Sequence, residues 1–433
     1  MVEGNYKVKK CSMPIDWVVE VPGSKSMTNR ALLMAALADG TTILKGVLFS
    51  EDSRNFLGSL KVLGFHVEID EAAKIVTVEG CNGKIPVTSG EIYVGSAGTA
   101  ARFLTAMLAM AEGTFVVNAS EQMKKRPMKP LFEVLTDLGA EIKCLEKEGF
   151  LPVQIKGIGQ SAPQDEKCST KLDISESTQF LSALLLISPM MKQGLCIEVI
   201  SERKDGAYIR ITRKMMEQFG AVVDFDGKTY HMNSGISYKS GAYQIEPDVS
   251  AACYFYAAAA LTGGKAMVRN VTWKCMQGDL KFLELLEKMG CEVSDTPDGI
   301  EVKGPANSRL RGITVDMKDF SDQTMTLAAL APFADSDVRI ENIGHIRLQE
   351  SDRIHAIATE LNRLGISCEE EPDAVTIHPG MPKPTVVQTY EDHRMAMAFA
   401  LVGLRIEGIE ISDPMCCRKT FETYFDILDK LCD

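Results

Sequence analysis

The chain has 433 residues, which exceeds the size at which single hydrophobic cores usually stop growing, so we expect two domains. Hydrophobic residues make up 45% of the chain and charged residues 24%, an ordinary globular balance. The net charge of −12 argues against nucleic acid or an anionic membrane as a partner of the whole chain, but it permits a local basic site for a small anion.

The chain carries no segment that predicts a membrane, secretory or metal-binding protein. Its longest apolar runs, residues 181–191 and 251–262, are shorter than the roughly 20 residues that cross a bilayer, so we expect buried helices there. The basic N-terminus lacks the apolar segment of a signal peptide. The twelve cysteines show no C-x-x-C motif and the six histidines no zinc spacing, so we expect a cytoplasmic protein with reduced thiols and no metal.

Two helix patterns alternate along the chain at regular intervals. The first is a mostly apolar helix opened by a polar cluster, with predicted starts near Ser26, Thr99, Ser177, Ser250, Asp322 and His393. The second is an amphipathic helix that ends at a glycine followed by a strand, at Gly64, Gly139, Gly220, Gly290 and Gly365, with a sixth such helix expected over residues 423–431. This repeat predicts six α/β units whose apolar helices are buried.

Positive side chains gather near the starts of these helices or beside short polar turns. They are Lys25, Arg30, Arg102, Arg353, Arg394 and Lys419. Helix capping explains one polar residue per helix, but a cation in the first turn opposes the helix dipole. Because helix N-termini attract anions, the pattern predicts a site for an anionic ligand.

Several short motifs lie at these positions. PGSKSMTNRALL covers residues 22–33 and lacks the Walker spacing, while GSAGTAAR covers residues 95–102. QESDR, YEDHRMAMAF and RKTFETYF follow in the second half of the chain. Taken alone, each motif is weak, because glycine turns and charged turns are often structural.

Together with KKRPM, STQFLSALLL and MQGDLKFLELLEKMG, these motifs resemble the signatures of the 5-enolpyruvylshikimate-3-phosphate synthase family, in that family's order from about Pro14 to Phe425. The resemblance implies an α/β enolpyruvyl transferase fold: two similar domains of three βαβαββ-type repeats with buried parallel helices, an inside-out α/β barrel. It implies that residues 23–244 bind mainly shikimate 3-phosphate. Residues 1–22 with 245–433 would contribute phosphoenolpyruvate-binding and catalytic residues.

The family's functional residues are carried over position by position. The implied catalytic residues are Lys25, Asp322, Glu350, His393 and Lys419. Those implied to bind shikimate 3-phosphate are Lys25, Ser26, Arg30, Ser177, Thr178, Gln179, Tyr208, Asp322, His345 and Gln349. Those implied to bind phosphoenolpyruvate are Lys25, Gly98, Arg126, Gln179, Arg353, Arg394 and Lys419.

The implied reaction moves the enolpyruvyl group of phosphoenolpyruvate to the 5-hydroxyl of shikimate 3-phosphate and releases phosphate, as a step toward chorismate and the aromatic amino acids. It is an addition followed by an elimination, through a tetrahedral intermediate. Asp322 would contact the 5-hydroxyl, and Glu350 would carry the proton at the methylene carbon. The resemblance also implies a glyphosate-sensitive enzyme, most simply a monomer, that needs no metal and no other cofactor.

Four positions depart from the family's pattern. Ser96 stands where the family often has asparagine, and Asp205 where it has a serine beside the 3-phosphate. His345 replaces an asparagine and Gln349 a lysine. These changes bear on substrate affinity more than on the type of reaction.

Two other functions remain possible from the sequence. The transferase that acts on UDP-N-acetylglucosamine has the same fold but places a reactive cysteine in its first domain, whereas no cysteine lies between Cys81 and Cys144. A non-catalytic homologue that binds a phosphorylated metabolite is favoured slightly by Asp205 and Gln349. Retention of Lys25, Asp322 and Glu350 argues against it.

Overall fold

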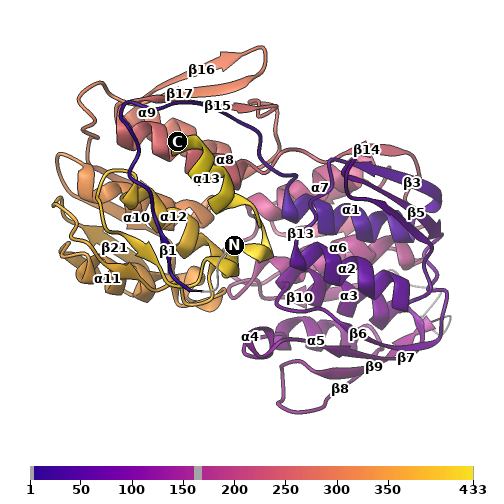
Figure 1. Cartoon of the computed structure of the whole chain (residues 1–433). Helices are drawn as coiled ribbons and strands as arrows, with labels where there is room; N and C mark the ends of the chain where they lie inside the picture. The colour runs from indigo at the N-terminus through magenta and orange to yellow at the C-terminus, as the bar shows by residue number, and fades with distance from the viewer. Residues whose placement is uncertain (1–3, 160–167, 433) are drawn as a thin grey trace. The chain divides into compact units, whose positions relative to one another are not determined.

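The computed structural model describes residues 4–159 and 168–432, which form alternating helices and strands (Figure 1). The chain divides into two compact units. Gly23–Glu246 form the continuous unit, and Met1–Pro22 with Pro247–Asp433 form the split unit. The sequence places the second boundary two residues earlier, after residue 244.

The described part of the continuous unit contains three four-stranded sheets. The first has the order β14 (Ala242–Gln244), β3 (Asp39–Lys45), β5 (Ile75–Cys81), β4 (Val67–Asp70). The second is β6 (Ser89–Tyr93), β7 (Glu112–Asn118), β9 (Val153–Ile158), β8 (Glu141–Cys144), and the third is β10 (Cys168–Leu172), β11 (Leu195–Val199), β13 (Thr229–Met232), β12 (Val223–Phe225). In each sheet one parallel pair is followed by two antiparallel pairs, which is the βαβαββ arrangement.

Six longer helices accompany these sheets. Three are buried on nearly every side and contact one another: α1 (Lys25–Leu37), α3 (Gly98–Met110) and α6 (Thr178–Ile187). The others are amphipathic: α2 (Glu51–Val62), α5 (Lys129–Asp137) and α7 (Ala207–Gln218). The short helix α4 spans Glu121–Lys124.

The described part of the split unit repeats this plan. Its sheets are β16 (Glu292–Thr296), β17 (Gly299–Lys303), β15 (Lys265–Arg269), β2 (Asp16–Val19); β18 (Ile313–Asp316), β19 (Val338–Glu341), β21 (Ala374–Ile377), β20 (Cys368–Glu370); and β1 (Tyr6–Lys7), β23 (Glu410–Ile411), β22 (Val386–Val387). The buried helices are α8 (Val249–Thr262), α10 (Thr324–Leu330) and α12 (His393–Gly403). The amphipathic helices are α9 (Lys281–Lys288), α11 (Arg353–Arg363) and α13 (Tyr424–Cys432).

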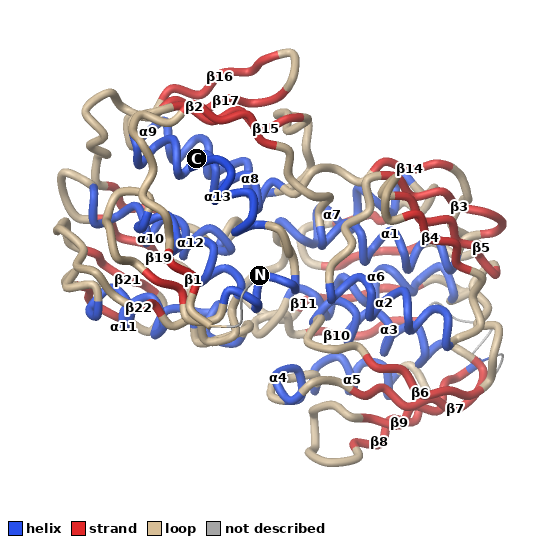
Figure 2. The backbone as a smooth tube through the Cα atoms, viewed as in Figure 1, coloured by secondary structure: helices blue, strands red, loops and turns tan. Residues whose placement is uncertain are grey.

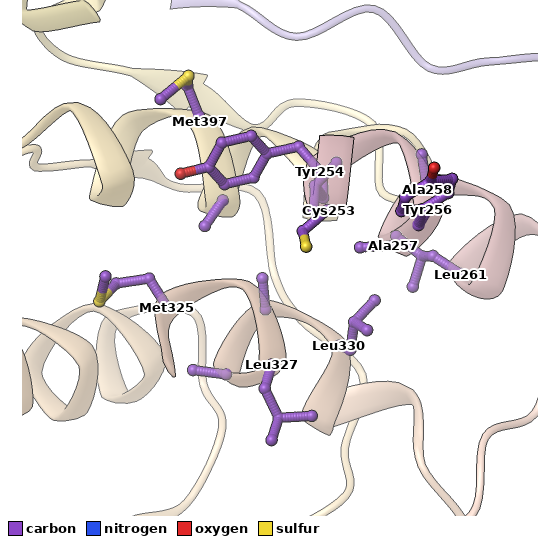
Figure 3. Close-up of a cluster of buried hydrophobic side chains, with 14 of the residues drawn as sticks. Cys253, Tyr254, Tyr256, Ala257, Ala258, Leu261, Met325, Leu327, Leu330 and Met397 are labelled. Atoms are coloured by element: carbon purple, nitrogen blue, oxygen red, sulfur yellow. The ribbon is translucent and has the colours of Figure 1, made fainter. Parts of the chain in front are cut away.

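The core of the split unit lies between its three buried helices. Every residue of α8 is buried, and its Tyr254, Tyr256 and Leu261 belong to the same hydrophobic cluster as Leu327 and Leu330 of α10 (Figure 3). A helix that is apolar all round can be accommodated only inside the protein, because it has no polar face to turn toward water. The apolar helices therefore lie inside each unit, and the strands and amphipathic helices surround them, as Figure 2 shows.

The predicted α/β fold of repeated units is confirmed. The buried helices begin within two residues of the predicted starts, allowing for the 3₁₀ turn η4 (Ser321–Gln323) that precedes α10. The helix-ending glycines all have a positive φ, which only glycine adopts readily: Gly64, Gly139, Gly220, Gly290 and Gly365. The sixth amphipathic helix, α13, lies where it is predicted.

The N-terminal segment completes two sheets of the split unit. Strand β2 pairs in parallel with β15, and β1 pairs with β23 near the C-terminus. In Figure 1 this indigo segment runs beside the yellow C-terminal elements. The strand β14 does the same for the continuous unit by pairing in parallel with β3. Among the described residues, three sheets are thus completed at one edge by strands distant in sequence.

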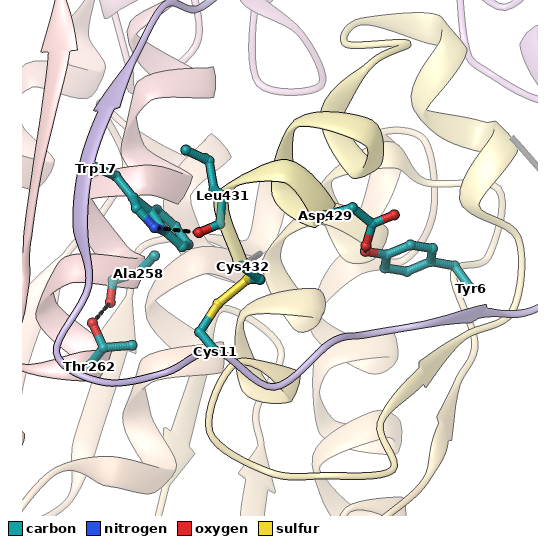
Figure 4. Close-up of a disulfide and its surroundings, with 8 residues drawn as sticks. All are labelled: Tyr6, Cys11, Trp17, Ala258, Thr262, Asp429, Leu431 and Cys432. Atoms are coloured by element: carbon teal, nitrogen blue, oxygen red, sulfur yellow. Dashed lines mark hydrogen bonds between the residues drawn. A yellow bond between two sulfur atoms is a disulfide. The ribbon is translucent and has the colours of Figure 1, made fainter.

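The expectation that all thiols are reduced is wrong for one pair. Cys11 and Cys432 form a disulfide across a sequence separation of 421 residues (Figure 4). Nothing in the sequence predicts this bond, because the two cysteines meet only when the N-terminal segment packs beside α13. The same contact includes Tyr6, whose hydroxyl donates to Asp429 at 2.6 Å, and Trp17, whose Nε1 donates to the Leu431 carbonyl at 2.9 Å.

Candidate active site

Two carboxylates of the split unit each contact two cations. Asp322 accepts hydrogen bonds from Arg353 Nη1 at 3.1 Å and from Arg394 Nη2 at 2.7 Å. Glu350 accepts one from Arg353 Nη2 at 3.0 Å, and its other oxygen lies 3.2 Å from Lys419 Nζ. These five residues come from η4, η7 (Pro414–Lys419), the starts of α11 and α12 and the loop before α11. The structure thus brings all five residues together. The three cations among them are the ones that the sequence predicts for an anion site in this unit.

The guanidinium of Arg353 is the centre of this cluster, with only 1% of the side chain exposed. Asp392, the N-cap of α12, accepts hydrogen bonds from its Nε at 2.7 Å and from its Nη2 at 3.2 Å, and Gln349 accepts another from Nη1. Burial disfavours the charged guanidinium, but Asp392, Glu350 and Asp322 outweigh burial and raise the pKa of Arg353 above its ordinary value. All five N–H donors are engaged, so an anion at this site must compete with the protein's own carboxylates.

Two histidines predicted for the site lie at its edges. His393 is the first residue of α12, and its buried ring has Nδ1 3.9 Å from Asp392 Oδ1. His345, in η6 (Gly344–Leu348), has Nε2 2.9 Å from the hydroxyl of Ser321, the residue before Asp322. Both rings therefore contact residues next to the charged cluster.

The carboxyl group of Asp279 lies close enough to Asp322 to be affected by its charge, and the sequence did not predict Asp279 as a site residue. It is in η3 (Gly278–Leu280), is 5% exposed, and its Oδ1 accepts hydrogen bonds from Ser250 at 2.8 Å and from Gln323 at 2.7 Å. Burial, followed by the charge of Asp322, raises its pKa to about 6. Asp279 therefore joins the starts of α8 and α10 through a carboxyl group that is unusually easy to protonate.

In the continuous unit, two arginines surround Gly98 at the start of α3. A Cβ at this position would lie 2.6 Å from Arg102 Nη1 and 2.9 Å from both Nη atoms of Arg126, so the absence of a side chain leaves room for the arginines. Arg102 Nη1 also donates to Gln179 Oε1 at 2.7 Å. Arg102 thus links the predicted phosphoenolpyruvate residues Gly98 and Gln179, and Arg126 lies beside the same glycine.

The N-terminus of α6 presents two hydroxyl-bearing residues. Ser177 is the N-cap, and its Oγ accepts a hydrogen bond from the backbone N–H of Gln179 at 3.2 Å. Thr178 is the first residue of the helix. The exposed N–H groups and positive dipole end of such a helix suit a phosphate group.

The start of α1 carries the remaining predicted residues of this unit. Lys25 Nζ lies 3.4 Å from Asp52 of α2. Arg30 donates to the carbonyl of Ser26 at 2.8 Å and to the carbonyl of Tyr208 at 3.2 Å, and burial lowers its pKa to about 10. Ser26, Arg30 and Tyr208 are therefore neighbours, with the guanidinium held inside the protein.

Sequence reasoning missed three residues that hold the predicted ones in place: Asp52, Asp279 and Asp392. It named Arg102 as a cation at a helix start, but not as a partner of Gln179. Arg102 and Asp392 lie inside motifs that were noted, but an acidic N-cap such as Asp392 is common at any helix start. The family resemblance places Asp205 beside the 3-phosphate of the substrate. In the structure its carboxylate accepts a hydrogen bond from Arg210 Nη1 at 2.9 Å. At the other altered position, the hydroxyls of Ser96 and Ser120 are 2.7 Å apart.

Residues 4–159 and 168–432 contain neither a cluster of metal ligands nor a membrane-spanning helix. No group of three or more His, Cys, Asp or Glu side chains among them could hold a metal ion. None of the helices in the described ranges has both the length and the apolar character needed to cross a bilayer.

Comparison with known proteins identifies the family. The family model for EPSP synthase (3-phosphoshikimate 1-carboxyvinyltransferase) matches residues 10–428. The 3-phosphoshikimate 1-carboxyvinyltransferase of Nostoc punctiforme is 42% identical over 97% of both chains, and that of Trichormus variabilis is 44% identical over 95% of both. The solved EPSP synthase of Acinetobacter baumannii superposes with a TM-score of 0.80 at 24% identity, over 99% of this chain and 98% of the other, which shows the shared fold. The chain belongs to the EPSP synthase family of 3-phosphoshikimate 1-carboxyvinyltransferases.

Proposed function

We propose that this chain transfers the enolpyruvyl group of phosphoenolpyruvate to the 5-hydroxyl of shikimate 3-phosphate and releases phosphate. The observation that carries the proposal is the pair of carboxylates in the split unit. Asp322 and Glu350 each lie between two cations, which compensate the charge of each carboxylate when it is ionised. A reaction that both adds and removes a proton needs two such groups.

The cations of the split unit bind phosphoenolpyruvate in this proposal. Arg353, Arg394 and Lys419 supply three positive charges for a carboxylate and a phosphate, and the arginine fork fits both groups. Gly98, Arg126 and Gln179 of the continuous unit bind the same substrate in this proposal. Because Gly98 has no side chain, it leaves space for the side chains of the neighbouring arginines. Lys25 binds both substrates in this proposal.

Shikimate 3-phosphate is bound mainly by the continuous unit. Its phosphate lies at the N-terminus of α6, at Ser177 and Thr178. Ser26, Arg30 and Tyr208, which are already neighbours, complete the pocket. The proposed binding residues for this substrate also include Asp322, His345 and Gln349 of the split unit.

The reaction begins when the methylene carbon of phosphoenolpyruvate takes a proton, with Glu350 as the carrier and Lys419 as its charge partner. The 5-hydroxyl oxygen attacks the resulting cationic carbon and loses its proton to Asp322, giving a tetrahedral adduct. A proton then leaves the new methyl group, the bond to the phosphate oxygen breaks, and the double bond re-forms. The cations compensate charge throughout, since one unit-charge pair at 4 Å is worth about 4 kcal/mol at an effective dielectric near 20.

Binding of the substrate must rearrange the charges of the split unit. Among the described residues of this cluster, the cations Arg353, Arg394 and Lys419 contact the carboxylates of Asp322, Glu350 and Asp392. An incoming dianion therefore replaces some of these internal pairs, and protonation of Glu350 or Asp322 lowers the cost of doing so. This links substrate binding to the proton transfer that starts the reaction.

We assign the protein to the cytoplasm and expect it to act as a monomer. The measurement that tests the proposed function is phosphate release from phosphoenolpyruvate with shikimate 3-phosphate as acceptor, compared with UDP-N-acetylglucosamine. Phosphate release from phosphoenolpyruvate with shikimate 3-phosphate as acceptor, and none with UDP-N-acetylglucosamine, supports the proposal. Release with only the nucleotide sugar supports the related transferase, and release with neither supports a non-catalytic binding protein.

A further inference from the structure

The third sheet of the continuous unit carries a Cys-His-Asp series on its outer face, apart from all residues of the candidate active site. Cys196 on β11 lies directly opposite His231 on β13 in the antiparallel register, so both side chains project from the same face. The alternate residues Leu195, Ile197 and Tyr230 are buried on the inner face. Cys196 and His231 are only partly buried.

The three side chains are connected in one line. The Sγ of Cys196 lies 3.2 Å from Nδ1 of His231, and Nε2 of His231 lies 3.0 Å from Oδ2 of Asp226. The second oxygen of Asp226 accepts hydrogen bonds from the backbone N–H groups of Lys228 at 2.9 Å and of Thr229 at 2.8 Å. The carboxylate is therefore fixed by the turn between β12 and β13, and it fixes the ring.

This arrangement places a base in contact with the thiol. The contact with His231, together with the two backbone donors, lowers the pKa of Asp226, so this carboxylate is charged near neutral pH and holds the ring with Nδ1 beside the sulfur. A ring that takes the thiol proton at Nδ1 leaves a thiolate, which is the reactive form of cysteine. Asp224, opposite His231 on β12, adds a second acidic residue beside the ring.

The neighbouring charged residues of this face pair with one another and leave the contact between Cys196 and His231 in place. In the next row of the sheet, Glu198 faces Lys171 across β10 and pairs with Lys228 and Lys171. Its negative charge is thus compensated by two lysines. His231 remains the group in direct contact with the sulfur.

We propose that Cys196 is a modification site at which a hydroperoxide oxidises the thiol to a sulfenic acid. The thiolate sulfur attacks one peroxide oxygen, the S–O bond forms and the O–O bond breaks. The leaving oxygen takes the proton held by His231 and departs as water or an alcohol. The sulfur is oxidised by two electrons and the peroxide is reduced by two.

Other cysteines of the same chain provide internal controls. Burial, followed by the charge of Glu79, raises the pKa of Cys81. Burial, followed by Glu370 and Glu369, raises the pKa of Cys368 to about 12. Both are partly buried, as Cys196 is. A difference in rate between Cys196 and these two therefore reports the local chemistry and not exposure.

The test is a timed reaction of the whole protein with limiting hydrogen peroxide at pH 7, with sulfenic acid trapped by dimedone and located by peptide mass spectrometry. Timed alkylation by iodoacetamide gives a second rate, which needs no oxidant. We expect Cys196 to react about tenfold faster than Cys81 and Cys368 in both reactions. Equal rates at the three cysteines would overturn the proposal.

Two variants separate activation from mere accessibility. His231→Asn should slow both reactions at Cys196 to the range of Cys81, and Asp226→Asn should slow them less. His66→Asn removes a surface histidine 3.4 Å from Glu79 in the same unit and should leave the rate at Cys196 unchanged. Phosphate release should be unaffected in all three variants. A folded His231→Asn protein whose Cys196 reacts as fast as the wild type would contradict the role of the ring.

Discussion

Lys419 Nζ and Glu350 Oε1 lie 3.2 Å apart, with only 7% and 11% of the two side chains exposed. The same carboxylate accepts a hydrogen bond from Arg353. These two cations compensate the charge of Glu350 once it has given up its proton, which is the state that the proposed transfer to phosphoenolpyruvate produces.

Replacing Glu350 by Gln should reduce kcat by about 10² to 10⁴ while KM for phosphoenolpyruvate changes much less. The amide keeps the size of the side chain but cannot carry the proton. Steady-state phosphate release measures both constants. Glu360→Gln is the matched control, because Glu360 is fully buried and paired with Arg363 further along α11. The control should lower the melting temperature and leave kcat near the wild-type value. Equal kcat values in the two variants would remove Glu350 from the mechanism.

Replacing Asp279 by Asn should change how stability depends on pH. In the folded protein the pKa of this carboxyl is about 6, whereas in the unfolded chain it titrates near its ordinary value of 3.8. The folded state therefore binds the proton more tightly. The stability that this group contributes is present below pH 3.8 and is lost as the pH rises to about 6, a difference on the order of 3 kcal/mol.

Denaturant unfolding of the wild type and of Asp279→Asn at pH 4, 5, 6 and 7 measures this difference. The wild type should lose stability relative to the variant between pH 4 and pH 6, and the two curves should run parallel above pH 7. Parallel curves over the whole range would mean that Asp279 titrates as an exposed carboxyl does.

Adding one methyl group at Gly98 should weaken phosphoenolpyruvate binding and inhibition by glyphosate. The new Cβ would lie within 3 Å of the guanidinium groups of Arg102 and Arg126, so these side chains must move. We expect the wild type to be inhibited below millimolar glyphosate and Gly98→Ala to need far more, with KM for phosphoenolpyruvate raised. Gly58→Ala in α2 is the control, because a Cβ there meets no described atom within 4 Å. A wild-type enzyme that resists millimolar glyphosate would contradict the prediction.

The disulfide predicts the number of titratable thiols. The sequence contains twelve cysteines, and the Cys11–Cys432 bond leaves ten free. Ellman titration of the unfolded, unreduced protein should therefore count ten thiols, and reduction should raise the count to twelve. A count of twelve without reduction would mean that the bond does not form in solution, as the sequence alone suggests.

The repeated helices could be predicted because their signals are local. An apolar run after a polar cap gives the start of α8 or α12, and a glycine with positive φ gives the end of the amphipathic helices. The candidate site residues could be named because the motifs follow the family's order. Their proximity within each unit follows from the regular repeat, which brings equivalent helix starts together.

The partners of the site residues could not be predicted, because they come from other repeats. Arg353 and Asp392 are 39 positions apart, and nothing in either motif indicates that they meet. The sequence attributes the cations at the helix starts to an anionic ligand alone. In the structure, Asp392 and Asp322 already compensate Arg353, which depends on the packing of α10, α11 and α12 and not on local pattern.

In the proposed reaction this chain uses phosphoenolpyruvate and shikimate 3-phosphate as its two substrates. Phosphate release by the purified protein, measured with each substrate omitted in turn, tests whether it needs both. We expect release only when both are present, with the enolpyruvyl ether of shikimate 3-phosphate formed in equal amount. Release without shikimate 3-phosphate, or no release with both substrates present, would contradict the claim.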